Sequence, residues 1–189
     1  MRRLLLLLLC LTLLGGCATT QRRGEQALYQ GRYNDAIQLF QATLAEHPDR
    51  LDARLGLGIA LYRVGALPDA AITLDEVLAR APDEGAALLY RGLIALQQGD
   101  DSAAADYLTR FRAVARIPRF DVQLDQALRI LRGAEPVGAD TRQFIAMSLE
   151  DAVRSAREVA QARLAVERAY LATFPPVHCA RTRGGWVCF

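Results

Sequence analysis

Cysteine and histidine are the side chains most able to supply nucleophilic or metal-binding chemistry here. The chain has four cysteines and two histidines. His178 precedes Cys179 directly, so a Cys–His nucleophile is one chemistry to consider. Neighbours in sequence rarely face each other with the geometry that proton transfer needs, and a disulfide at Cys179 would consume the thiol. His47 precedes a proline in an expected turn, where a solvated side chain is the simpler interpretation.

Motifs that would indicate an enzyme are absent from the sequence. It contains no HExxH zinc motif, no GxSxG elbow and no phosphate-binding loop. It also contains no lysine, which removes Schiff-base chemistry. Gly56 and Gly58 form a GxG pair, but inside an expected helix and without the strand that a dinucleotide-binding fold requires. We predict no catalytic residue, no metal site and no cofactor apart from covalent lipid.

The first seventeen residues have the layout of a secretory signal. Two arginines precede a leucine-rich run that ends at Leu14, too short for the roughly 20 residues of a membrane-spanning helix. The run leads into Leu14-Gly15-Gly16-Cys17, which resembles a bacterial lipobox. The resemblance implies a signal peptide at 1–16, diacylglycerol on the Cys17 sulfur and an N-acyl chain, typically palmitate, on its amino group. The alternative is an ordinary secretory signal with a chance cysteine.

The residue after the lipobox cysteine bears on location. In the lipoproteins that this segment resembles, aspartate after the cysteine favours the inner membrane, whereas this chain has Ala18. The resemblance therefore implies the periplasmic face of the outer membrane. Arg22 and Arg23 would then lie near the headgroups, either in contact with anionic lipid or simply solvated.

Two further cysteines lie near the end of the chain. Cys179 and Cys188 flank a segment with Gly184-Gly185, a pair suited to a hairpin turn. An even pair of cysteines in an oxidising compartment favours a structural disulfide. A metal site is the alternative, with His178 as the nearby histidine.

The charge balance argues against nucleic acid as a partner. The chain has 23 basic and 21 acidic residues, and removal of Arg2 and Arg3 with the signal would leave equal numbers. Nucleic-acid-binding domains are usually strongly basic. The length suits one modest domain.

A set of five positions recurs every 34 residues. The set comprises two glycines, an alanine, a large apolar residue and a proline, and the third copy has four of the five: Gly24, Gly31, Ala36, Phe40 and Pro48; Gly58, Gly65, Ala70, Leu74 and Pro82; Gly92, Gly99, Ala104 and Leu108. Small residues let two helices approach, and the large apolar residue fills the gap between them. The second glycine suits a left-handed helix end, and proline stops the following helix.

This pattern resembles the tetratricopeptide repeat, a 34-residue helical hairpin that stacks on its neighbours. We therefore expect an all-α, right-handed superhelical stack of three repeats, at 17–50, 51–84 and 85–118. Unrelated helices in a bundle are the alternative. Phe111 and Arg116 depart from the pattern, which predicts an unusual junction after the third hairpin.

The remaining sequence predicts three more elements. A helix at 119–133 has one apolar side, as a cap on the open end of a stack requires. A long helix is expected at 139–174, with a seam at Ile145, Leu149, Ala152, Ala156, Ala160 and Leu164. Packing of this helix on the repeats is favoured over projection. Residues 175–189 form a tail with a small disulfide-closed hairpin.

The family resemblance also implies a concave partner groove lined by the first helix of each repeat. Its candidate residues come from the first two copies: Glu25, Leu28, Tyr29, Asp52, Leu55, Ile59, Tyr62 and Arg63. In the third copy the corresponding residues are apolar, including Leu89, Leu93 and Leu96, and we expect the long helix to cover them. The mixed polar and aromatic stretch would then bind a partner peptide.

Two functions fit this reading. The first is a non-enzymatic adaptor, tethered by lipid to the outer membrane and holding a protein of the bacterial envelope. The second is a structural subunit that oligomerises through its long helix.

Overall fold

The computed structural model describes residues 16–115, 118–133, 135–173, 179–182 and 185–188. Its helices are α2 (Gly16–Tyr29), α3 (Tyr33–Glu46), α4 (Leu51–Arg63), α5 (Leu67–Arg80), α6 (Gly85–Gln98), α7 (Asp101–Val114), α8 (Pro118–Leu131) and α9 (Ala139–Thr173). Two strands follow, β1 (Cys179–Thr182) and β2 (Gly185–Cys188). The predicted signal peptide lies almost wholly outside the described residues.

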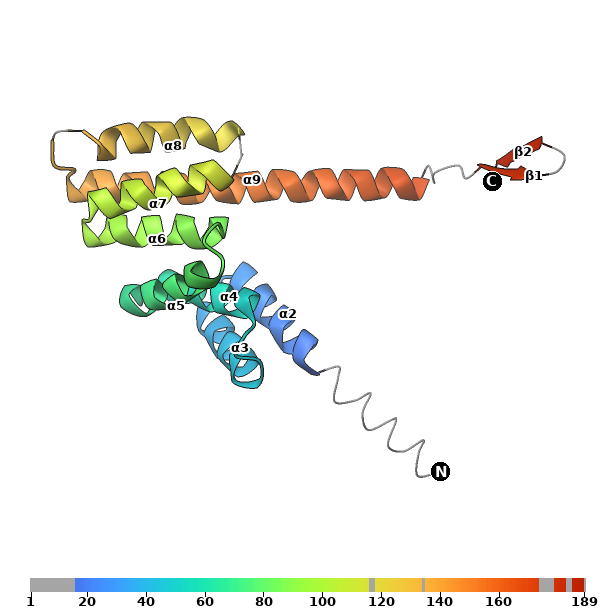
Figure 1. Cartoon of the computed structure of the whole chain (residues 1–189), viewed down its shortest axis with the longest axis horizontal. Helices are drawn as coiled ribbons and strands as arrows, with labels where there is room; N and C mark the ends of the chain where they lie inside the picture. The colour runs from blue at the N-terminus through green and yellow to red at the C-terminus, as the bar shows by residue number, and fades with distance from the viewer. Residues whose placement is uncertain (1–15, 116–117, 134, 174–178, 183–184, 189) are drawn as a thin grey trace, which may run out of the picture.

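Helices α2 to α7 form three consecutive hairpins. Each odd-numbered helix packs on the even-numbered helix before it, giving the pairs α2–α3, α4–α5 and α6–α7. The first helices of successive pairs also contact one another, α2 with α4 and α4 with α6. The first helices therefore share an inner layer, and α6 to α9 lie together at the other end of the stack from α2 (Figure 1).

A left-handed glycine ends the first helix of every hairpin, as the spacing predicted. Gly31, Gly65 and Gly99 have φ values of 75°, 81° and 80°. After α2, the amide of Arg32 donates to the Ala27 carbonyl and that of Gly31 to the Leu28 carbonyl, at 2.9 and 3.2 Å. These bonds satisfy carbonyls that the helix end would otherwise leave unpaired.

The small and large positions of the repeat meet inside each hairpin. A Cβ at Gly24 would lie 2.9 Å from a ring atom of Phe40, and a Cβ at Gly58 would lie 2.8 Å from Leu74 Cγ. The corresponding contact in the third hairpin joins Gly92 and Leu108. The predicted close approach is confirmed, because a larger residue has no space at these positions.

The junction after the third hairpin uses an aromatic pair. Phe111 meets Phe120 of α8 edge to face, with ring centroids 5.3 Å apart. Helix α8 buries the apolar side predicted for a cap, including Leu124 and Leu128. Phe111, which departs from the repeat pattern, therefore provides an aromatic contact through which α8 packs on α7.

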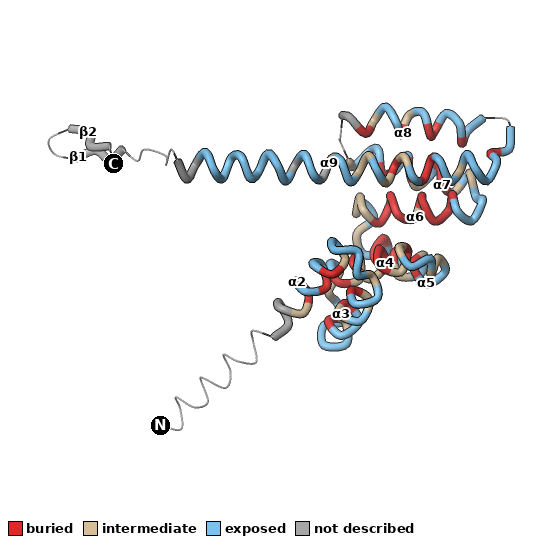
Figure 2. Tube along the Cα trace, turned by 180° about the vertical axis from the view of Figure 1, so that it is seen from behind, coloured by how far each residue is buried: buried red, intermediate tan, exposed pale blue. Residues whose placement is uncertain are grey.

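Helix α9 divides into a packed half and a projecting half. Ile145, Ala146 and Leu149 are buried in the main core cluster, and α9 contacts both α6 and α8. From Arg154 onward its described side chains are mostly exposed, and the helix extends past the stack (Figures 1 and 2). The prediction that the whole seam packs on the repeats is wrong at Leu164, which is 52% exposed. The physical reason is that α9 continues in space past the ends of α6 and α8, the helices on which its first half packs (Figure 1).

The tail contains the predicted hairpin. β1 and β2 pair antiparallel, with Cys179 opposite Cys188. The cysteine side chains lie outside the description, so the disulfide stays a prediction. Among the described residues, no helix combines enough length and apolarity to cross a membrane.

Candidate protein-binding groove

The eight predicted groove residues lie on two neighbouring helices. Helix α2 provides Glu25, Leu28 and Tyr29, and α4 provides the other five. Because α2 and α4 contact each other, the structure brings the two sets to adjoining surfaces. The surroundings of these residues differ strongly between the α2 end and the α6 end.

At the α2 end the side chains are accessible. Tyr29 is 77% exposed, and Leu28 is half-buried against both core clusters. Glu25 is exposed and accepts a 2.9 Å hydrogen bond from the Nε2 of Gln21. Gln21 is buried, and its Oε1 has no hydrogen-bond partner within the described part of the chain. This end therefore presents an aromatic ring and a carboxylate to a partner, and the Gln21 amide supports Glu25 from below the surface.

Asp52 takes a local role instead of facing a partner. Its carboxylate accepts from Arg50 Nη2 at 2.7 Å and from the backbone amide of Ala53 at 2.9 Å. The hydrogen bond from Arg50 lowers the pKa of Asp52. An acid in this position stabilises the first turn of α4 through the helix dipole. Leu55 remains half-buried on the same helix.

Tyr62 lies at the end of α4 and is buried, with 5% of its surface exposed. Its hydroxyl donates to Glu150 Oε1 of α9 at 2.5 Å and accepts from Gln97 Nε2 at 2.9 Å. Burial, followed by the hydrogen bond to Glu150, raises the pKa of Tyr62. The tyrosine therefore stays a neutral donor to the carboxylate.

Arg63 completes a polar cluster around the same carboxylate. Its guanidinium forms an ion pair with Glu150, and its Nη2 donates to the Tyr90 hydroxyl at 3.2 Å. The guanidinium carbon also lies 5.9 and 5.8 Å from the ring centroids of Tyr62 and Tyr90. Desolvation opposes the charge of Arg63, but Tyr90 and Glu150 outweigh it and raise its pKa.

These contacts correct the prediction that Tyr62 and Arg63 are open to a partner. Helix α9 was expected to cover Leu89, Leu93 and Leu96, and all three are buried. Helix α9 also covers Tyr62 and Arg63 through Glu150, and Ile59 is buried as well. On α9 itself Arg154 pairs with Asp151, whereas Glu150 pairs with Arg63 across the groove.

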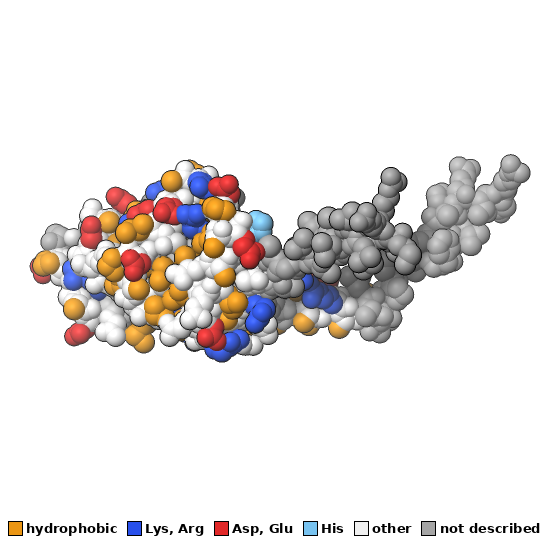
Figure 3. Space-filling view, turned by 90° about the horizontal axis from the view of Figure 1, so that it is seen from below, with side chains coloured by type: hydrophobic (Ala, Val, Ile, Leu, Met, Phe, Trp, Pro, Cys, Tyr) orange, Lys and Arg blue, Asp and Glu red, His pale blue; other side chains and the backbone are white. Residues whose placement is uncertain are grey.

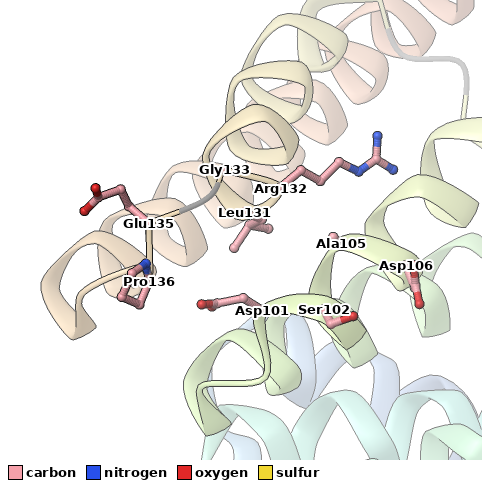
Figure 4. Close-up of a pocket in the computed structure, with 9 residues that line it drawn as sticks. All are labelled: Asp101, Ser102, Ala105, Asp106, Leu131, Arg132, Gly133, Glu135 and Pro136. Carbon is pink, nitrogen blue, oxygen red and sulfur yellow. The ribbon is translucent and has the colours of Figure 1, made fainter.

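A separate pocket of about 520 Å³ lies between α7 and α8. Figure 4 shows Asp101 and Ser102 from the start of α7 opposite Leu131 and Pro136. Asp101 is held by Arg142, whose Nε and Nη2 donate to its two oxygens at 2.7 and 2.9 Å. The pocket lining contains no histidine, cysteine or lysine, and its Asp101 is already paired with Arg142, so we assign it no chemistry.

In the described part of the chain we find no metal site, and the face in Figure 3 shows no basic patch. Across the described residues, no group of three or more His, Cys, Asp or Glu side chains is placed to hold a metal ion. On the face in Figure 3, acidic, basic and apolar side chains are interspersed instead of forming a basic patch. The α2–α4 surface is therefore the candidate site.

Comparison with known proteins supports the repeat assignment. Residues 27–92 match a family model described as tetratricopeptide repeat, and residues 69–116 match a second with the same description. Residues 27–116 thus match tetratricopeptide repeats. Repeats of this kind generally mediate protein–protein interaction and scaffolding, and typically have no enzymatic activity.

One curated relative and two solved structures illustrate the likeness. The chain is 34% identical over 155 residues to cellulose synthase 2 operon protein C of Komagataeibacter xylinus, covering 73% of this chain but 12% of that much longer protein. The Yersinia enterocolitica type III secretion chaperone SycD, in complex with a peptide of the translocator YopD, has a TM-score of 0.55 at 19% identity. The match covers 61% of this chain and 91% of SycD. MamA has a TM-score of 0.56 at 16% identity, over 77% of this chain and 81% of MamA. At these identities the two structures show a shared fold alone.

Proposed function

We propose that this chain is a non-enzymatic adaptor, tethered by lipid to the periplasmic face of the bacterial outer membrane. It binds a protein partner of the envelope and aids the assembly or recruitment of a complex. The observation that best supports partner binding is the accessible α2 end of the α2–α4 surface, where Tyr29 is 77% exposed beside the half-buried Leu28. Exposed aromatic residues next to apolar surface are typical of protein contacts.

The proposed anchor is Cys17 with a diacylglycerol and an N-acyl chain. The support is the lipobox-like Leu14-Gly15-Gly16-Cys17 after a short apolar run. One acyl chain of myristoyl length gives marginal binding, whereas two or three chains hold a protein durably on a membrane. Because α2 begins at Gly16, the first hairpin would lie directly beside the lipid.

The anchor is tested by metabolic labelling with an alkyne palmitate and by membrane fractionation. We expect label and membrane association in the native chain and loss of both in Cys17→Ser. Retention of the Cys17→Ser chain in the outer membrane would contradict the anchor without affecting the repeat assignment.

The partner is tested by purification from detergent-solubilised envelopes. The native chain is compared with a double variant on α2, Glu25→Arg with Tyr29→Ala. Ile72→Ala, on the exposed surface of α5, is the matched control because Ile72 is 61% exposed. We expect a defined protein that is retained by the native chain and the control but lost from the double variant. Equal retention by all three would contradict the proposed surface.

The alternative function is a structural subunit that oligomerises through α9. The specific observation in its favour is the projecting half of that helix, where Val159, Leu164 and Val166 are 42%, 52% and 69% exposed. Light scattering of the Cys17→Ser chain separates the two functions. A monomer at micromolar concentration supports the adaptor, and a stable oligomer that Leu164→Arg disrupts supports the subunit.

A further inference from the structure

Helix α9 is held on the inner layer by the kinds of contact with which a protein binds a separate peptide: hydrogen bonds and an ion pair to a carboxylate, next to apolar packing. Three donors converge on the Glu150 carboxylate or on its nearest partner. Tyr62 and Arg63 bond to its two oxygens, and Gln97 bonds to the Tyr62 hydroxyl. The donors come from α4 and α6, whereas the carboxylate comes from α9, 88 residues after Tyr62. The inner layer therefore contains a preformed carboxylate acceptor.

Apolar surface lies beside this acceptor. Leu89, Leu93 and Leu96 of α6 share one buried cluster with Ile145 and Leu149 of α9. Leu149 directly precedes Glu150, so a single helical turn delivers both an apolar side chain and a carboxylate to the inner layer. A ligand for this site thus needs a leucine-like residue next to an acidic one, on one face of a helix.

The acceptor is costly to leave empty. The Arg63 and Glu150 side chains are 29% and 18% exposed, so each charge is largely removed from water. Loss of either partner leaves the other charge partly buried without compensation. The three leucines of α6 would also become accessible to water. Replacement of α9 by another segment therefore costs less free energy than its departure alone, because the new segment restores the ion pair and covers the leucines.

The hold of α9 on the stack is limited in extent. Its packed contacts end near Val153, and roughly the second half of the helix extends beyond α6 and α8. Figure 2 shows the change from buried to exposed residues along the helix. A competing segment thus has to match a contact of about four helical turns, from Ala139 to Val153, and not the whole of α9.

We propose that the α4–α6 inner surface is a second partner site, which binds an acidic amphipathic helix in exchange for α9. This inference rests on the proposed protein-binding function and specifies the chemistry of the partner. The partner presents an aliphatic side chain to the α6 leucines and a neighbouring carboxylate to Tyr62 and Arg63. Helix α9 occupies this surface in the structure. The apparent affinity for the partner is therefore the intrinsic affinity multiplied by the fraction of molecules in which α9 has left the surface.

The test uses the chain's own segment as the probe. A fluorescein-labelled peptide of residues 143–156 is titrated with the full chain carrying Cys17→Ser, and binding is followed by fluorescence anisotropy. Glu150→Arg in the chain places two cations together, which releases α9 while leaving Arg63 available to the peptide. We expect at least tenfold tighter peptide binding than in the parent chain. Glu158→Arg, the same substitution on the exposed half of α9, should leave the affinity unchanged.

Two further variants keep the test decisive. A probe with glutamine at position 150 should bind the Glu150→Arg chain at least tenfold more weakly than the native probe. A chain with Arg63→Glu and Glu150→Arg together restores the ion pair in reverse and should return peptide binding to the parent level or below. Hydrogen exchange at residues 143–153 should rise in Glu150→Arg and recover in the double variant. If Glu150→Arg does not fold by circular dichroism, the isosteric Glu150→Gln chain replaces it, with an expected gain of several-fold.

Equal peptide binding by the parent chain and the opened variant would overturn the proposal. So would equal binding of the native and glutamine probes. Neither result depends on an envelope partner or on the lipid, so failure here is distinct from failure of the proposed function. Conversely, failure to retain an envelope protein would leave the peptide result standing.

Discussion

Gly56 of α4 lies directly against the ring of Phe40 on α3, across the boundary between the first and second hairpins. A Cβ built at position 56 would lie 2.7 and 2.8 Å from two carbons of that ring, closer than real Cβ contacts. Phe40 is completely buried and also touches Gly24. One ring therefore joins α2, α3 and α4, and two glycines provide the space for it.

Gly56→Ala should destabilise the stack because Phe40 is enclosed and cannot move aside. We expect a loss of about 1–3 kcal/mol in the free energy of unfolding, the range typical of overpacking. This loss should exceed the roughly 1 kcal/mol that alanine gains over glycine in a helix. Urea denaturation provides the measurement, with Gly138→Ala as control, since a Cβ there meets nothing within 4 Å. Equal midpoints for the two variants would show that Phe40 is not confined.

Leucine-to-alanine substitutions in the two halves of α9 should differ in their effect on stability. Leu149→Ala removes a side chain that is 1% exposed, whereas Leu164→Ala removes one that is 52% exposed. We expect the first to cost about 2–5 kcal/mol, as for other buried leucines, and the second to stay within about 0.5 kcal/mol. Chemical denaturation of both variants distinguishes them. A comparable loss at Leu164 would mean that the outer half of α9 is packed in solution.

The ion pair between Asp101 and Arg142 predicts a pH dependence of stability. The hydrogen bonds from Arg142 lower the pKa of Asp101 from its ordinary 3.8. A carboxyl with a depressed folded-state pKa adds stability that is fully present above the unfolded value and disappears as the pH falls through the folded value. We expect Asp101→Asn to unfold at lower urea than the native chain near neutral pH. The gap between the two midpoints should close progressively below pH 3.8.

Asp106→Asn is the matched control for this pair, because Asp106 lines the same pocket and is exposed. Its effect on the urea midpoint should be small at every pH. A difference between native and Asp101→Asn chains that persists unchanged at the acidic end would contradict the assigned role of Arg142.

The register of the C-terminal hairpin predicts a disulfide. Cys179 and Cys188 are directly opposite in the antiparallel pair, and closing such a loop stabilises a small hairpin. Protein isolated from an oxidising compartment should have no reactive thiol at either position, and its intact mass should be lower by two hydrogen atoms. Thiol alkylation followed by peptide mapping is the measurement. Full alkylation of both cysteines without reductant would rule the bond out.

Local rules made the hairpins predictable from sequence. The glycines at 31, 65 and 99 end their helices through their own backbone preference, and the pairing of Gly58 with Leu74 follows from a fixed spacing within one repeat. Such features depend on residues fewer than 34 positions apart. The same logic located the capping face of α8 around Leu124 and Leu128.

Tertiary geometry explains what the sequence did not reveal. Glu150 fits an ordinary helical ion pair with Arg154, and nothing local indicates that it reaches Tyr62 and Arg63 instead. The projection of α9 is also invisible in its pattern, since Leu164 continues the seam of Leu149 without a break. Whether a seam is covered depends on where the neighbouring helices end, which is a property of the whole stack.

The most direct test of the central claim is site-specific photo-cross-linking in the native envelope. A photoreactive phenylalanine analogue is placed at Tyr29 on the proposed partner surface and, in a separate chain, at Ile72 on α5; the two native side chains are 77% and 61% exposed. An adaptor that binds through its α2–α4 surface should give a discrete protein adduct from position 29 and none from position 72. No adduct at position 29, or the same adduct from both positions, would contradict the account.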